Sequence, residues 1–167
     1  YSAGIAQKIS ESDVIAVSMQ SFGYGDIAIT TVNNPEGNIG TFSPRSNVFN
    51  LGYARTFSSS IYGGINIKVI TESMSNLKAT GFAVDAGIQY VTGTNEDRDN
   101  VKFGIALKNV GTPLKFGGDG LSTRVTAPNT TGVYQLTVEN KASGFEIPSL
   151  LNIGAAYEFK FGADHGL

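Results

Sequence analysis

The sequence alternates large apolar residues with small or polar residues over most of its length. This period of two recurs in seven segments, at 1–9, 14–20, 47–57, 61–72, 80–91, 101–110 and 151–161. Successive side chains of a β-strand point to opposite faces of a sheet, so such alternation indicates strands with two unlike faces. No segment has a convincing helical period. The sequence therefore predicts an all-β fold built from about seven antiparallel strands.

The two faces of these predicted strands differ in size as well as polarity. One face carries Phe, Ile, Leu, Tyr and Val, and the other carries small or polar residues, among them Gly52, Gly64, Gly81, Gly87, Gly104 and Gly154. A soluble β-sandwich buries its large face and has no need of glycine on its solvated face. In a transmembrane β-barrel, lipid covers the large apolar face and the lumen holds the small and polar side chains. We therefore predict a transmembrane β-barrel, with a soluble β-sandwich or lipocalin-like barrel as the alternative.

The links between the predicted strands alternate in length. Links 10–12 and 58–60 are short, whereas links 27–45 and 111–148 are long. Alternate links of an antiparallel sheet lie at the same end, so both long links fall on one side. Short periplasmic turns and long outer loops are typical of outer-membrane barrels. Within the second long link, segment Gly132–Asn140 alternates again, and we interpret it as a hairpin arm that extends outward.

Seven strands do not close a barrel readily, because single-chain bacterial barrels have an even number of at least eight. We therefore interpret residues 1–167 as a single domain that is an incomplete, central portion of a larger barrel. The alternative is one further strand that the pattern does not reveal.

Composition excludes several classes of protein. There is no Cys, which excludes a disulfide scaffold and a Cys-based metal site or nucleophile. The isoelectric point of about 5.3 disfavours a nucleic-acid partner. The one His, His165, lies in a Gly-rich tail, and the acidic segment 95–100 lacks the ligand spacing of a calcium loop. We therefore predict no catalytic residue, no metal and no cofactor, and hence a protein that is not an enzyme.

Three charged residues fall on the small face of successive predicted strands, at Lys68, Asp85 and Lys108. If the intervening turns are centred near residues 75 and 96, Asp85 lies beside Asn66 to Lys68 on one side and near Lys108 on the other. An unpaired charge in a narrow lumen is costly. We therefore predict a lumenal ladder of ion pairs, the alternative being independent charges solvated by channel water.

The long link 111–148 is rich in apolar residues for a loop. Its candidate contact residues are Leu114, Phe116, Leu121, Val133, Tyr134 and Phe145. Loops of this length tend to be functional or disordered, and exposed apolar patches often mark interaction sites. We expect the link either to fold back as a lid on the barrel mouth or to bind a partner.

Several short motifs, taken in their order and spacing, resemble one protein family. They are Phe22-Gly-Tyr-Gly-Asp-Ile27, Asn34-Pro-Glu-Gly37, Leu51-Gly-Tyr-Ala-Arg55, Tyr62-Gly-Gly-Ile-Asn-Ile-Lys68, Gly81-Phe-Ala-Val-Asp-Ala-Gly87 and Phe103-Gly-Ile-Ala-Leu-Lys-Asn-Val-Gly111. Together they resemble the PorV/PorQ family of Bacteroidota outer-membrane proteins, which is similar in turn to the FadL-type barrels. The resemblance extends over most of residues 1–160. Because members of that family are about twice as long, it implies that this chain is a middle portion.

The resemblance implies a barrel of fourteen strands in the bacterial outer membrane, associated with the type IX secretion system. PorV-like members accept cargo with a C-terminal signal domain from the large translocon and present it to a sortase-like attachment complex. It offers no catalytic residue to carry over. The first hypothesis is thus a protein-interaction subunit of type IX secretion. The alternatives are a FadL-like transporter of hydrophobic small molecules and a soluble β-domain with a binding role.

Overall fold

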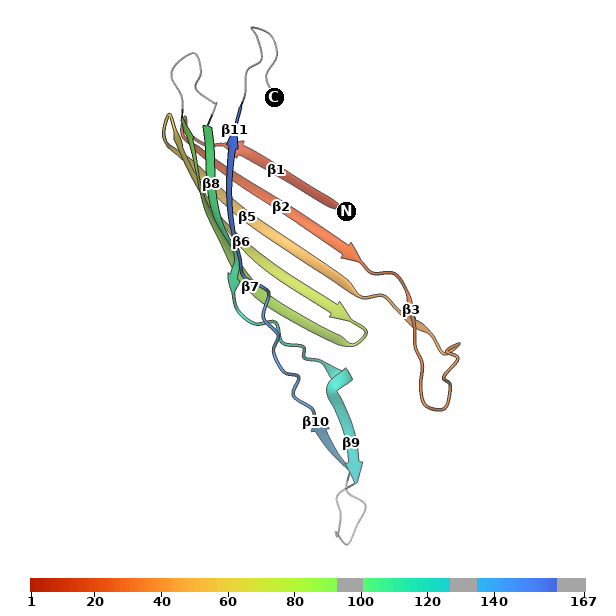
Figure 1. Ribbon diagram of the computed structural model, residues 1–167. Helices are drawn as coiled ribbons and strands as arrows, with labels where there is room; N and C mark the ends of the chain where they lie inside the picture. Colours follow the sequence, from red (N-terminus) through yellow and green to blue (C-terminus); the bar gives the residue numbers. More distant parts are fainter. Residues whose placement is uncertain (93–100, 127–134, 159–167) are drawn as a thin grey trace.

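The computed structural model describes residues 1–92, 101–126 and 135–158. Its main feature is one antiparallel sheet of seven strands in the order β1-β2-β5-β6-β7-β8-β11 (Figure 1). The strands are β1 (Ser2–Lys8), β2 (Asp13–Gly23), β5 (Arg45–Ser58), β6 (Ile61–Met74), β7 (Leu77–Thr92), β8 (Val101–Gly111) and β11 (Leu150–Tyr157). The predicted all-β fold and the seven antiparallel strands are confirmed. The sheet is open, with β1 and β11 as its two edges.

Several strands extend beyond the range in which the sequence alternates. Strand β7 begins at Leu77, three residues before the predicted start, because it pairs with β6 as far as the tight turn at Ser75 and Asn76. Ser75 adopts a positive φ of 53° in that turn. Pairing between neighbours therefore lengthens these strands past the point where their side-chain pattern fades.

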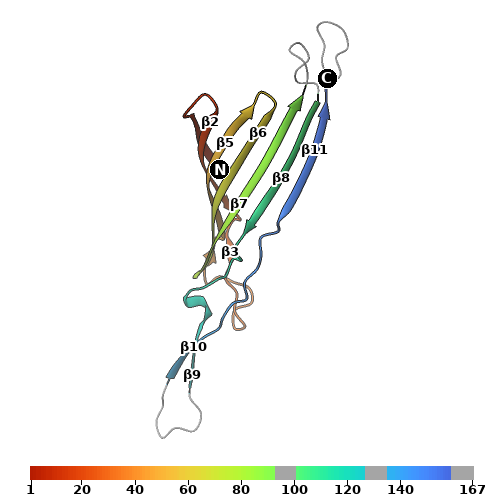
Figure 2. The same ribbon diagram turned by 90° about the vertical axis from the view of Figure 1, so that its left-hand side faces the viewer.

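Two further hairpins extend from one end of the sheet (Figure 2). In link 27–45, β3 (Ile27–Ala28) pairs with β4 (Thr41–Phe42). In link 111–148, the short 3-10 helix η1 (Asp119–Leu121) leads into β9 (Ser122–Thr126), which pairs with β10 (Gln135–Glu139). Strand β10 lies within the predicted hairpin arm, whereas its partner β9 and the pair β3–β4 were not predicted.

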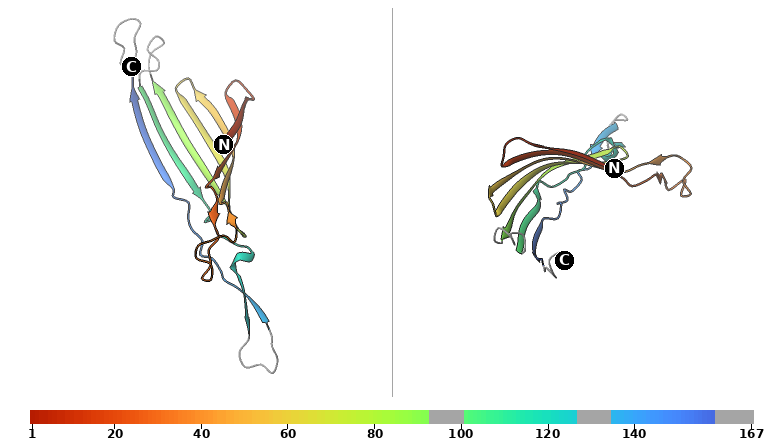
Figure 3. Two further views of the ribbon diagram at one scale, coloured as in Figure 1. Left: turned by 90° about the vertical axis from the view of Figure 1, so that its right-hand side faces the viewer. Right: turned by 90° about the horizontal axis from the view of Figure 1, so that it is seen from above.

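The sheet is curved (Figure 3). Its two faces have different residues. Residues directly opposite one another on neighbouring strands share a face, so the register identifies each face. One row of the convex face reads Ile5, Val17, Leu51, Ile67 and Val84. The adjacent row of the concave face reads Ala6, Ala16, Gly52, Asn66 and Asp85. Large apolar residues therefore cover the convex side, and small or polar residues line the concave side.

The small buried core lies on the concave face, at the end of the sheet from which the hairpins extend. It consists of Ile70, Ala79, Ala83 and Leu114, with Val48, Phe116 and Ile147 packed against it. By contrast, most large apolar residues of the convex face are exposed. Within the described ranges, no helix is long and apolar enough to cross a membrane.

Candidate functional site

An ion pair lies near the middle of the concave face. Nζ of Lys68 on β6 is 2.7 Å from Oδ1 of Asp85 on β7. The side chains are only 12% and 20% exposed, so the pair is partly shielded from water. Breaking such a pair leaves an unpartnered charge in a poorly hydrated site, which is destabilising. The structure thus brings together two of the three charged residues that the sequence singled out.

Asn109 on β8 completes the surroundings of this ion pair. Its backbone N–H donates to Oδ1 of Asp85 at 2.8 Å, and its side-chain Oδ1 accepts from Nζ of Lys68 at 2.5 Å. Asn109 has a φ of +60°, and the register between β7 and β8 shifts beside Asp85. Asn tolerates this left-handed conformation better than most residues. A β-bulge therefore aims a backbone donor at the carboxylate, as bulges near functional sites often do.

Sequence reasoning missed Asn109, although the sequence contains a signal for it. The convex-face residues Leu107 and Val110 are three positions apart, whereas strict alternation would separate them by two. That extra residue marks the bulge.

A chain of polar side chains continues from Asp85 across three further strands. Nδ2 of Asn66 lies 3.4 Å from Oδ2 of Asp85 and 3.3 Å from Oδ1 of Asn50. Nδ2 of Asn50 donates in turn to Oγ of Ser18 at 3.2 Å. These contacts join β7, β6, β5 and β2 on the concave face. They satisfy polar groups that the curvature of the sheet brings close together.

Lys108 does not take part in the predicted ladder. It lines the same hollow of the concave face as Asn66 and Asp85, and it is exposed. In the described part of the chain, Lys108 forms no ion pair. The physical reason is that Lys68, Asn66 and the Asn109 N–H already occupy the carboxylate of Asp85. The expectation of a ladder with Lys108 as a third member is therefore corrected to a single ion pair.

The base of the long link 111–148 packs onto the concave face. Leu114 is 1% exposed, and it packs against Ile70, Ala79 and Ala83. The backbones of Leu114 and Phe145 form reciprocal hydrogen bonds of 2.8 and 2.9 Å, so both arms of the link are held together. Leu114 is therefore packed against the sheet and has no surface for a partner. We call the base of the link around Leu114 and Phe145 the lid; because the sheet is open, a lid over a barrel mouth stays a prediction.

The base of this link is also tied to the polar site. Nδ2 of Asn109 donates to the carbonyl of Pro148 at 3.2 Å, and Oγ of Ser149 donates to the carbonyl of Asn109 at 3.1 Å. Asn109 therefore contacts both the ion pair and the segment that leads into β11. The ion pair and the lid are parts of one connected structure.

The other candidate contact residues of the link differ in accessibility. Phe116 and Leu121 are half-buried, and the ring of Phe116 stacks on that of Phe145 with centroids 5.8 Å apart. Phe145 remains 41% exposed. Val133 and Tyr134 lie outside the described residues, as do His165 and the acidic segment 95–100. Phe145 is thus the predicted contact residue that presents the largest described surface.

The β9–β10 hairpin presents an exposed apolar surface within the long link. Val125 lies opposite Leu136, and Thr123 lies opposite Val138, so these four side chains share one face. Val125, Leu136 and Val138 are 41–54% exposed. An isolated two-stranded hairpin is only marginally stable in water. An exposed apolar face on such a hairpin is typical of a surface that binds another molecule.

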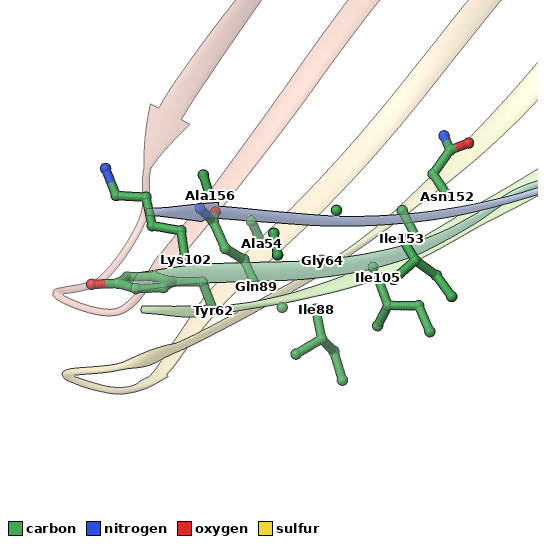
Figure 4. A pocket seen from close by; sticks show the side chains of 16 residues that line it. Ala54, Tyr62, Gly64, Ile88, Gln89, Lys102, Ile105, Asn152, Ile153 and Ala156 are labelled. Carbon is green, nitrogen blue, oxygen red and sulfur yellow. The ribbon is translucent and has the colours of Figure 1, made fainter. Parts of the chain in front are cut away.

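Towards the opposite end of the sheet, the concave face forms an open trough of about 720 Å³. Its floor is made of glycine and alanine, with Tyr62, Gln89, Lys102 and Asn152 around it. Figure 4 shows that Ile88, Ile105 and Ile153 point to the other side of the sheet from Lys102, Asn152 and Ala156. The trough therefore exists because the small residues of the alternating pattern fall together on this side.

Comparison with known proteins does not identify a relative. No family model matches the sequence, and neither a curated protein nor a solved structure matches it. Within the described ranges, no three His, Cys, Asp or Glu residues lie close enough to hold a metal ion. The fold and the site define an all-β protein. It is an open, curved antiparallel sheet whose concave face carries small and polar residues.

Proposed function

We propose that this chain forms part of a non-enzymatic outer-membrane β-barrel that serves the type IX protein secretion system as a protein-interaction subunit. The observation that carries the proposal is the exposure of the convex face. Leu51, Ile67 and Val84 lie side by side on neighbouring strands, and they are 44–47% exposed. Few soluble proteins leave so large an apolar surface uncovered.

Lipid explains this convex face better than a second protein layer does. A soluble sandwich needs another sheet packed about 10 Å away, and the described part of the chain contains none. Every backbone group in a membrane needs a hydrogen-bond partner, and a sheet meets this need only when it closes into a barrel. The edges β1 and β11 therefore need further strands.

Strand direction limits how the sheet can close. Neighbouring strands alternate in direction, so in a sheet of seven the edges β1 and β11 run the same way. All-antiparallel closure then needs an odd number of additional strands. A second copy inserted in the same orientation supplies seven more, but it would pair β11 with β1 in parallel. A barrel of fourteen strands, as the family resemblance implies, needs seven more strands arranged as one continuous antiparallel run. Because seven is odd, such a barrel can close with every neighbouring pair antiparallel.

The partner-binding part of the proposal rests on the long links. The hairpins β3–β4 and β9–β10 both extend from one end of the sheet, which also carries the tight β6–β7 turn, whereas the β1–β2 and β5–β6 turns lie at the other end. Under the proposal this end faces the cell exterior, as long loops do in outer-membrane barrels. The apolar face of β9–β10, together with Phe145, provides the surface for the translocon, for cargo with a C-terminal signal domain, or for the sortase-like attachment complex.

Fractionation of native membranes tests the proposal in two steps. We expect detergent to release the protein, whereas high salt and alkaline carbonate leave it with the membrane. Mild-detergent purification should then co-purify the translocon or the attachment complex. A matched variant, in which a short Gly-Ser turn replaces residues 122–139, should stay in the membrane and lose the partner. Recovery of the wild-type protein in the aqueous fraction would refute the barrel.

A FadL-like transporter of hydrophobic small molecules is the second candidate, and the trough of about 720 Å³ favours it. Its volume lies within the range of roughly 300–1,000 Å³ that is usual for small-molecule pockets. Polar groups that line the trough, such as Lys102 and Asn152, argue against a hydrophobic ligand there. Co-purification of a fatty acid without any protein partner would select this function over the first.

A further inference from the structure

The convex face contains a groove of about 580 Å³ among its large side chains. Two small residues create it, because Gly63 lies opposite Ile88 and Ala86 lies opposite Ile65 on the paired strands β6 and β7. The surrounding walls are apolar and comprise Tyr53, Phe57, Ile65, Ile88, Ile105 and Leu107. A smooth lipid-facing surface does not require such a groove.

Phe57 forms one wall of the groove. A Cβ atom at Gly63 would lie 2.8 Å from Cε2 of Phe57, so the ring leans over the glycine. The β-bulge between Thr56 and Ser58 changes the register of the strand next to this ring. Phe57 is still 64% exposed, so its outer side remains available to another molecule.

A cation stands at the rim of the groove. Arg55 lies directly opposite Gly63 and also lines the groove. Its Nε is 3.7 Å from Oδ1 of Asp13, and its side chain is 52% exposed. In the described part of the chain, Arg55 donates no hydrogen bond, while Asp13 is held by Ser10 and Tyr53. The planar guanidinium therefore keeps donors for a further anion, and phosphate suits their geometry.

We propose that this groove is a binding site for one phospholipid, with an acyl chain along Gly63 and Ala86 and the phosphate on Arg55. The inference rests on the proposed function, because it requires the convex face to lie in a bilayer. Charge complementarity selects a phospholipid over a second copy of the chain, since an apolar groove with a cation at one end matches an apolar tail with an anion at one end. The groove is also continuous with the apolar face that lipid covers.

Lipid retention tests the site. The protein is reconstituted with equal amounts of dioleoylphosphatidylglycerol and dioleoylglycerol, and lipids that remain after mild-detergent extraction are quantified by native mass spectrometry. We expect the wild-type protein to retain the phospholipid about fivefold better than the neutral lipid, as one charge-assisted contact would produce. Arg55→Gln should abolish this preference, and Ala86→Leu should lower retention of both lipids.

Two control variants separate the site from general effects. Arg45→Gln removes a cation at the opposite end of β5, and Ala155→Leu enlarges an alanine of the convex face outside the groove. Both should retain phospholipid as the wild-type protein does. If all variants insert and retain lipid equally, the site is refuted although the barrel stands. If the wild-type protein does not enter bilayers, the proposed function fails and the site fails with it.

Discussion

The convex and concave faces of the same sheet are organised in different ways. The convex face consists of large apolar side chains that are about half exposed and have little to pack against except one another. The concave face has hydrogen bonds between side chains, an ion pair and the packed base of link 111–148. Side-chain positions on the concave face are therefore set by internal partners, whereas the convex face depends on its surroundings for stability.

This difference shows why one alternating pattern serves two physical tasks. Each strand contributes its large residues to one environment and its small residues to the other, so a single substitution affects one face alone. Predicted effects on the two faces should accordingly differ in size and in their dependence on lipid.

The largest predicted effect comes from a charge on the convex face. Leu51→Arg places a cation in the middle of the apolar surface, and we expect it to lower the free energy of unfolding in phospholipid vesicles by about 2–4 kcal/mol. The neighbouring substitution Asn50→Arg points to the concave face and should cost less. Urea unfolding in vesicles, followed by circular dichroism, measures both. Equal costs would break the distinction between the faces.

Removal of the buried side chain of the lid should have the next largest effect. Leu114 is 1% exposed in the small core, and we expect Leu114→Ala to cost about 2–3 kcal/mol through lost burial and the cavity left behind. Limited proteolysis should then cut link 111–148 more readily. Phe145→Ala, at a residue that is 41% exposed, serves as the control and should cost clearly less. Unchanged proteolysis of L114A would argue against the lid.

The ion pair should contribute less, because part of it is solvated. We expect Lys68→Met to cost about 1–2 kcal/mol, since it leaves Asp85 without its cation, whereas full burial would raise that cost. The double substitution Lys68→Met with Asp85→Asn should cost less than the sum of the single ones. Lys108→Met should have almost no effect, because Lys108 is unpaired among the described residues. An effect as large as that of K68M would restore Lys108 to the ladder.

These faces were predictable from the sequence to unequal degrees. Alternation alone identifies the convex row Leu51, Ile67 and Val84, because each residue follows the period of its own strand. It also places Lys68 and Asp85 on one face, because the turn between β6 and β7 is short enough to fix the register. Lys108 was misassigned, because the bulge at Asn109 changes which group of β8 meets the carboxylate.

The lid was harder to predict for a different physical reason. Burial of Leu114 depends on tertiary packing against Ala79 and Ala83, which are far from it in the sequence. Their small side chains leave room for the leucine. Apolar residues in a loop indicate that something covers them, but local pattern does not say what. The hairpin β9–β10 likewise has one arm with clear alternation, whereas β9 contains Val125 as its one large apolar residue and so has no pattern that distinguishes it from a loop.

The smallest predicted effect concerns the end of the sheet that carries the β1–β2 turn. Asp13 is the first residue of β2, beside the β1–β2 turn and opposite Arg55, so under the proposal it lies at the level of the lipid phosphates and not in the apolar band. The hydrogen bond from Ser10 lowers the pKa of Asp13 below its ordinary value, with further lowering by Tyr53 and Arg55. A carboxyl group with a lowered pKa stabilises the folded state above its unfolded pKa, and this contribution is lost as the pH falls through the folded pKa.

We expect a carboxyl-carbon NMR titration to show late protonation of Asp13 on acidification, and Ser10→Ala to shift its pKa back upward. Ser12→Ala, in the same turn, should leave the pKa of Asp13 unchanged. An equal shift in both variants would mean that the turn as a whole, rather than the Ser10 hydroxyl, holds the carboxylate ionised.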